Sequence, residues 1–142
     1  MVKNIVLFIM SLYRDDSVEK EYTDDSNLFK ANCKHTNETA LKYIAWKLSQ
    51  EQQQIDEIYA FISEQVRETS LDKFKELIQD EYYKDKIIDV PLYNNGEMKG
   101  SFKSISEMFD KLQAYKEKNP DDTVVIHVDM TGGLRHASML ML

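Results

Sequence analysis

The stretch KNIVLFIMSL, residues 3–12, decides the fold class. It is a continuous run of apolar and β-branched residues, which is typical of a central strand covered on both faces. Three more strand patterns follow, IDEIYAFI at 55–62, IIDVPLY at 87–93 and TVVIHV at 123–128, and each interval is long enough to hold a helix. Parallel strands require such crossovers. We therefore expect an α/β fold: a Rossmann-like, doubly wound, mainly parallel sheet with helices on both faces.

The intervals between the strands carry helical apolar patterns with capping residues in front of them. Thr36 fits the N-cap of a first helix, and Ser70 fits the N-cap of a second. Ser104 with Glu107 fits a capping box for a third, which KNPDD at 118–122 would end. The expected inner faces are Ala40, Leu41, Ile44, Ala45 and Leu48 in the first helix, Phe74, Leu77, Ile78 and Tyr82 in the second, and Ile105, Met108, Phe109, Leu112 and Tyr115 in the third.

The order of the strands in the sheet decides where a ligand would bind. The right-handed crossover rule places strands 3–12 and 123–128 side by side, with the strand order reversing between them. Pro91 removes a main-chain donor, so strand 87–93 should lie at an edge. Residues 13–35 are polar and acidic, and we interpret them as an excursion, such as a hairpin, over the end of the first strand. Open sheets of this kind bind ligands at the carboxyl ends of the strands beside the reversal.

Composition limits the class of protein. With 142 residues, the chain is expected to form a single domain, 1–142. The formal net charge of −7 argues against a surface that binds duplex DNA or an anionic membrane. The longest apolar run, Ile5 to Met10, is too short to span a bilayer. The single cysteine, Cys33, cannot form an internal disulfide, which favours a cytoplasmic location and a buried thiol over a catalytic one.

The stretch VVIHVDMTGGLRH, residues 124–136, predicts a ligand loop between a strand and a helix. The strand would deliver Asp129, Met130 and Thr131 to the carboxyl edge of the sheet. Glycines allow a backbone to turn sharply and to approach a ligand closely, and two follow at once, Gly132 and Gly133.

The residues after the two glycines favour an anion as the ligand. Free N–H groups at the start of the following helix bind anions, and Arg135 and His136 add donors in its first turn. These features indicate a phosphate-type site. The alternative is a plain Gly-Gly turn, with Asp129 capping the helix and Arg135 solvated. Thr36 and Asn37 are likewise either an N-cap and its neighbour or contacts to a nucleobase or phosphate at the same rim.

Other nucleotide and metal sites lack their motifs. No GxGxxG follows the first strand and no GxxxxGK[ST] occurs, which argues against a dinucleotide oxidoreductase and a P-loop NTPase. Cys33, His35, His127 and His136 lack the spacing of a zinc site. We therefore predict no cofactor and no metal, and His127 is expected to be a core or interface histidine.

Two segments resemble those of CRISPR-associated Rossmann-fold (CARF) domains. VVIHVDMTGGLRHASMLML, residues 124–142, is similar to their strand, Asp-x-Thr-x-Gly loop and helix, and KHTNETALKYIAWKL, residues 34–48, is similar to their first helix, entered through Thr-Asn. The order of the elements along the whole chain also fits. The sequence departs from complete members because it lacks the last strands and any effector domain, which predicts the front part of a longer protein or a truncated relative.

The resemblance implies a sensor domain of type III CRISPR antiviral defence. Such a domain would bind a cyclic oligoadenylate, the tetra- or hexa-adenylate, in a pocket shared by a homodimer, and would control an attached effector allosterically. The ligand-binding residues carried over are Ser11, Leu12, Thr36, Asn37, Asp129, Met130, Thr131, Gly132, Gly133, Arg135 and His136. Two alternatives stay open: a metal-independent ring nuclease that degrades the same messenger, and a protein-interaction module without a ligand.

Overall fold

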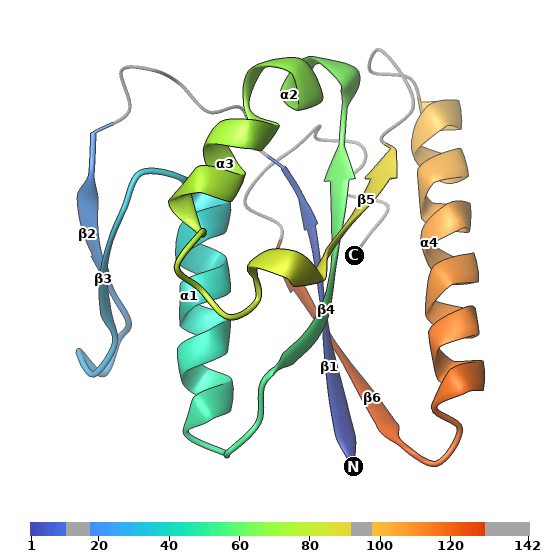
Figure 1. Cartoon of the computed structure of the whole chain (residues 1–142), viewed down its shortest axis with the longest axis horizontal. Coiled ribbons are helices and arrows are strands. Elements are labelled where there is room, and N and C mark those ends of the chain that lie inside the picture. The colour runs from blue at the N-terminus through green and yellow to red at the C-terminus, as the bar shows by residue number, and fades with distance from the viewer. Residues whose placement is uncertain (11–17, 92–97, 130–142) are drawn as a thin grey trace.

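A computed structural model describes residues 1–10, 18–91 and 98–129 of the chain (Figure 1). Its main sheet contains the strands β1 (Val2–Ile9), β4 (Ile55–Ile62), β5 (Ile87–Pro91) and β6 (Thr123–Asp129). Their order is β5-β4-β1-β6, and every neighbouring pair is parallel. The expected α/β fold with a parallel sheet is therefore confirmed, and so is the adjacency of the first and last of these strands.

β1 is an interior strand, and its carboxyl end pairs with the carboxyl ends of both neighbouring strands. Phe8 pairs with Asp129 of β6, and Ile9 pairs with Phe61 of β4. All residues from 5 to 10 are buried, as the unbroken apolar run predicts for a strand covered on both faces. β5 lies at the edge that its proline predicted, with Pro91 in the last pair of the ladder.

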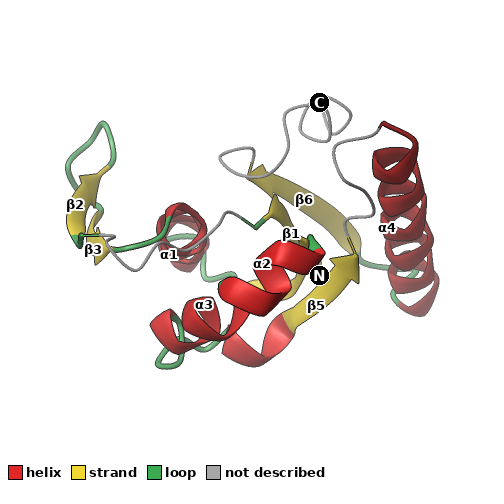
Figure 2. Cartoon of the chain, turned by 90° about the horizontal axis from the view of Figure 1, so that it is seen from above, coloured by secondary structure: helices red, strands yellow, loops and turns green. Residues whose placement is uncertain are grey.

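Helices cover both faces of this sheet. Figure 2 shows α1 (Thr36–Ser49), α2 (Glu64–Thr69) and α3 (Leu71–Leu77) on one face and α4 (Met98–Lys118) on the other. A short 3-10 helix, η1 (Lys84–Lys86), precedes β5. Alternate residues of β1 enter two separate cores, because successive side chains of a strand point to opposite faces. Val6, Phe8 and Met10 pack with the first three helices, and Ile5, Leu7 and Ile9 pack with α4.

Two of the expected helix starts are wrong, those of α1 and α4, while the start expected after Ser70 is confirmed in position. α1 is capped by His35, whose ring Nδ1 accepts a hydrogen bond of 3.1 Å from the backbone N of Asn37, and Thr36 is already the first helical residue. An additional short helix, α2, is capped by Ser63 and precedes α3. Ser70 is the N-cap residue of α3, as expected, but its side chain makes no cap hydrogen bond.

α4 also begins before its predicted cap. It starts at Met98, which places Ser104 inside it, where the Ser104 hydroxyl donates to the carbonyl of Pro91 at 2.8 Å. Ser104 therefore lies within α4 and is not its N-cap, and its hydroxyl ties this helix to the end of β5. The helix ends at Lys118, as the KNPDD motif predicted.

Residues 18–35 include an antiparallel hairpin, β2 (Lys20–Thr23) and β3 (Lys30–Cys33), that stands apart from the main sheet (Figures 1 and 2). A two-stranded hairpin is marginally stable by itself. Here Phe29 is buried against α1, with its ring 5.4 Å from that of Tyr43 and 5.6 Å from that of Trp46. This aromatic contact fastens the hairpin to the helix.

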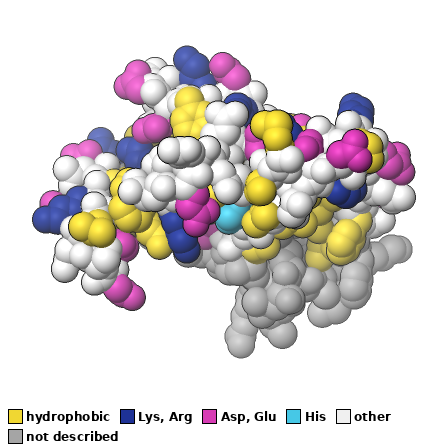
Figure 3. Space-filling model, turned by 90° about the horizontal axis from the view of Figure 1, so that it is seen from below, with side chains coloured by type: hydrophobic (Ala, Val, Ile, Leu, Met, Phe, Trp, Pro, Cys, Tyr) yellow, Lys and Arg dark blue, Asp and Glu magenta, His cyan; other side chains and the backbone are white. Residues whose placement is uncertain are grey.

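The surface carries charges of both signs. Figure 3 shows lysine or arginine and aspartate or glutamate side chains interspersed over the face seen from below. Within the described ranges, no helix combines the length and the apolar character that crossing a bilayer would need.

Candidate functional site

The candidate site is built around a buried hydrogen bond between two segments far apart in the sequence. The side-chain Nδ2 of Asn37, in the first turn of α1, donates to Asp129 Oδ2 at 2.8 Å, and it also lies 3.4 Å from the carbonyl oxygen of Ile9. Ile9 is the last residue of β1 and Asp129 is the last residue of β6. One amide group therefore joins the carboxyl ends of two neighbouring strands to the start of a helix.

Local sequence explains why these atoms meet. Because β1 and β6 are parallel and Phe8 pairs with Asp129, both strands end at the same level of the sheet. His35 has an extended backbone and caps the helix through its ring, so Asn37 stands at the second helical position, where its side chain can reach back over the strand ends. The ring of His35 is buried beside that of Phe74, 5.2 Å away, which holds the cap in place.

The two bonded side chains are nearly inaccessible. Asn37 is 0% exposed and Asp129 is 7% exposed, whereas Thr36 is exposed. A buried carboxylate requires hydrogen-bond donors in place of water, and Asn37 supplies one. Of these three predicted contact residues, Thr36 therefore presents its side chain at the surface, while the other two present theirs to each other.

The remaining predicted site residues lie outside the described residues. They are Ser11, Leu12, Met130, Thr131, Gly132, Gly133, Arg135 and His136. Ser11 and Leu12 follow the end of β1, and residues 130–136 follow the end of β6. These two strand ends are neighbours at the carboxyl edge of the sheet. The backbone N of Met10 still donates to the carbonyl of Phe61 at 3.0 Å, so the first of these segments leaves an ordered edge.

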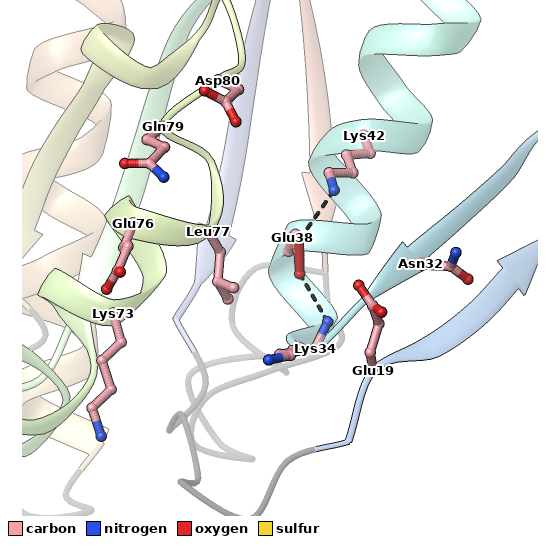
Figure 4. A pocket seen from close by; sticks show the side chains of 10 residues that line it. All are labelled: Glu19, Asn32, Lys34, Glu38, Lys42, Lys73, Glu76, Leu77, Gln79 and Asp80. Carbon is pink, nitrogen blue, oxygen red and sulfur yellow. Dashed lines mark hydrogen bonds and ion pairs between the residues drawn. The ribbon is translucent and has the colours of Figure 1, made fainter.

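A groove of about 560 Å³ lies beside the first turns of α1, between α3 and the hairpin (Figure 4). Figure 4 shows Glu38 at its centre: Glu38 Oε2 accepts from Lys42 Nζ at 3.1 Å, and Glu38 Oε1 accepts from the backbone N of Lys34 at 2.9 Å. Although burial alone would lower the pKa of the Lys42 ammonium, the hydrogen bond and charge of Glu38 raise it above its ordinary value. The charges of Glu38 and Lys42 therefore offset each other on the α1 side of the groove. The lining residues are Glu19, Asn32, Lys34, Glu38, Lys42, Lys73, Glu76, Leu77, Gln79 and Asp80.

Sequence analysis did not identify His35 as the cap of α1, or Glu38 as the residue that bonds Lys42 and the backbone of Lys34. The Glu38–Lys42 pair has the i,i+4 spacing that stabilises helices, so that signal was available. Nothing in the spacing marks His35 as a cap, since histidine is not a preferred residue there.

The other residues weighed for metal or thiol chemistry have structural surroundings. Among the described residues, no three His, Cys, Asp or Glu side chains are grouped as metal ligands. His127 lies 3.0 Å from Asn4 Oδ1 through its Nε2, on the neighbouring strand. Cys33 is buried, and burial raises the pKa of its thiol, which keeps it in the unreactive protonated form.

The described residues bring the ends of β1 and β6 and the start of α1 together at the carboxyl edge of the sheet, which is where parallel sheets bind ligands. Thr36 is exposed beside these strand ends, at the start of a helix whose Asn37 side chain is bonded to Asp129. Comparisons of the chain with family models, with curated proteins and with solved structures gave no match.

Proposed function

We propose that this chain is a sensor domain that binds a cyclic oligoadenylate and controls an attached effector, as its resemblance to CARF domains implies. One observation carries the proposal: Asn37 and Asp129, which come from the two resembling segments and are 92 residues apart, are hydrogen-bonded at the carboxyl edge between adjacent strands. Residues that were selected from the sequence as parts of one site thus meet where a parallel sheet binds its ligands.

The chemistry of the ligand suits such an edge. A cyclic tetra- or hexa-adenylate is a ring of phosphates with its bases directed outward, and backbone N–H groups at a turn and a helix start bind phosphate oxygens. A homodimer axis would match the symmetry of the ring. The net charge of −7 does not oppose this, because a few local donors replace the basic face that duplex DNA requires. We also propose a cytoplasmic location, where the messenger is made.

Calorimetric titration with cyclic tetra-adenylate and cyclic hexa-adenylate tests the proposal. We expect one of the two rings to bind, and we expect Arg135→Ala and Thr131→Val to weaken binding at least tenfold. Lys118→Ala is the matched control, because it removes a cation at the end of α4, next to the amino ends of the strands, and should leave the affinity unchanged. Absence of binding to either ring by the wild-type protein would refute the proposal. Chromatography of the same mixtures distinguishes a sensor from a ring nuclease, since only the nuclease yields linear products.

A second candidate, a protein-interaction module, is favoured by β6. This strand lies at the edge of the described sheet and exposes Val125, Ile126 and Val128 by 37%, 44% and 43%. An edge strand without charged residues or proline at its centre favours pairing with another strand. Light scattering after chromatography tests this: Ile126→Lys should reduce the mass of any complex, and under this candidate neither cyclic oligoadenylate would bind.

A further inference from the structure

The bond between Asn37 and Asp129 differs in kind from a ligand contact. Both side chains are buried, and the carboxylate of Asp129 is occupied by an amide donor from the same chain. The same Nδ2 group lies 3.4 Å from the carbonyl oxygen of Ile9. A ligand could reach these atoms only after displacing bonds that already satisfy them.

We infer that Asn37 is a positioning residue, which holds the ends of β1 and β6 in register with the start of α1 and does not itself touch a ligand. As far as the ligand is concerned, this inference rests on the proposed function. Asp129 directly precedes the predicted contact loop 130–136, and Ile9 lies two residues before Ser11. One amide group therefore fixes the points from which both predicted contact segments depart.

The chemistry of an amide explains why this position needs asparagine. Its –NH₂ group has two hydrogens, so it can donate to a carboxylate and to a carbonyl together. A carboxylate at position 37 has no hydrogen to donate when ionised, and it would stand beside a second carboxylate. Two like charges at hydrogen-bond distance raise the pKa of one of them, so the pair would take up a shared proton at a higher pH than an isolated carboxylate does.

Three variants test the inference: Asn37→Asp, Asp129→Asn, and the double exchange. Each is titrated with cyclic tetra-adenylate and cyclic hexa-adenylate and unfolded with urea, at pH 7.5 and pH 5.0. Asn37→Asp should weaken binding at least tenfold at pH 7.5 and much less at pH 5.0. Asp129→Asn should weaken binding less than Asn37→Asp does at pH 7.5, because its amide oxygen still accepts from Asn37. The double exchange restores a donor opposite a carboxylate, so it should recover most of the loss, although it does not restore the contact to Ile9.

The other titratable groups on the packed elements are common to all variants. They are His35 and Glu38 beside Asn37 on α1, Lys42 bonded to Glu38, and His127, which shares the Asp129 face of β6. Each variant is compared with the wild type at the same pH, which cancels the pH dependence that these groups contribute. The same comparison cancels the contribution of titratable groups in the segment after residue 129.

The outcomes separate the inference from the proposed function. If the wild type binds neither ring, the proposed function fails, but the urea midpoints still test the positioning role of the Asn37–Asp129 bond. That role requires Asn37→Asp to have a lower midpoint than the wild type and the double exchange to recover most of the difference. If the exchange recovers the urea midpoint but not the affinity, the two side chains contact the ligand and the inference is overturned while the function stands. If Asn37→Asp alters neither binding nor unfolding, the inference is also overturned.

Discussion

His127 and Asn4 join β6 to β1 through their side chains: Nε2 of the histidine lies 3.0 Å from Oδ1 of the asparagine. The Asn4 Nδ2 group donates to Gln53 Oε1 and to the carbonyl of Gln54, at 3.1 and 3.2 Å. Its Oδ1 is therefore the acceptor, and Nε2 of His127 carries the hydrogen. This half-buried histidine is a cross-strand contact to the interior strand and belongs to neither core cluster.

His127 should make folding sensitive to mild acid. Burial, and to a lesser degree the charge of Lys47, lower the pKa of its imidazole below the ordinary value of 6.5. The unfolded chain then binds a proton at higher pH than the folded one, so this contribution to stability is complete above pH 6.5 and is lost as the pH falls toward the folded pKa. We expect His127→Gln, which keeps a donor but does not titrate, to lose less stability than the wild type between pH 7.5 and 5.0 in urea unfolding. Equal losses would contradict this.

Strand order was predictable from sequence because it depends on strong, repeated signals. The unbroken apolar run of β1, the proline of β5 and the lengths of the crossovers leave few topologies open. Helix ends were harder, because they depend on tertiary partners. Ser104 fitted a cap by spacing, yet its hydroxyl bonds Pro91, a partner that only the folded chain brings near. The second expected helix ends at Leu77, before Tyr82, and Tyr83, not Tyr82, is buried in the core.

Replacing Tyr83 with phenylalanine should stabilise the folded protein. Its side chain is fully buried, and its hydroxyl has no hydrogen-bond partner among the described residues. Burial raises the pKa of this phenol far above its ordinary value, so it remains a donor without an acceptor. An unsatisfied buried hydroxyl costs about 1–3 kcal/mol. We expect Tyr83→Phe to raise the free energy of unfolding by about 1 kcal/mol, within that range.

Tyr59→Phe is the matched control for this substitution. Tyr59 is also buried in the core, but its hydroxyl donates to Glu57 Oε2 at 2.7 Å. Its removal should lower the free energy of unfolding by about 1 kcal/mol. A loss of stability in both variants would mean that the Tyr83 hydroxyl has a partner such as a buried water.

The candidate site was predictable in part. Asn37 and Asp129 were selected from separate motifs, and parallel pairing brings the ends of their elements to one edge. Their mutual bond was not predictable, because it depends on the level at which β1 and β6 pair and on the angle at which α1 starts. The cap at His35 follows from its packing on Phe74, which no spacing in the sequence indicates.

The start of α1 should depend on His35 more than on Thr36. His35 caps the helix through Nδ1 and packs on Phe74, and removing an N-cap side chain costs about 1 kcal/mol. We expect His35→Ala to lower the free energy of unfolding by at least about 1 kcal/mol. His35→Asn should recover part of this loss, because asparagine is a preferred cap. Thr36→Ala should cost less than His35→Ala, and the reverse order in urea unfolding would assign the cap to Thr36.

The hairpin should protect Cys33 through the contact of Phe29 with α1. Cys33 is the last residue of β3 and is buried, and Phe29 holds the hairpin against Tyr43 and Trp46. Phe29→Ala removes this anchor and should expose the thiol, so we expect alkylation of Cys33 at pH 8 to accelerate at least tenfold, with Trp46 fluorescence shifting to longer wavelength. Leu28→Ala is the control, since Leu28 is 76% exposed beside the same position and should leave the rate unchanged. An unchanged rate in Phe29→Ala, measured where urea unfolding shows the rest of the chain intact, would mean that the hairpin is held by other contacts.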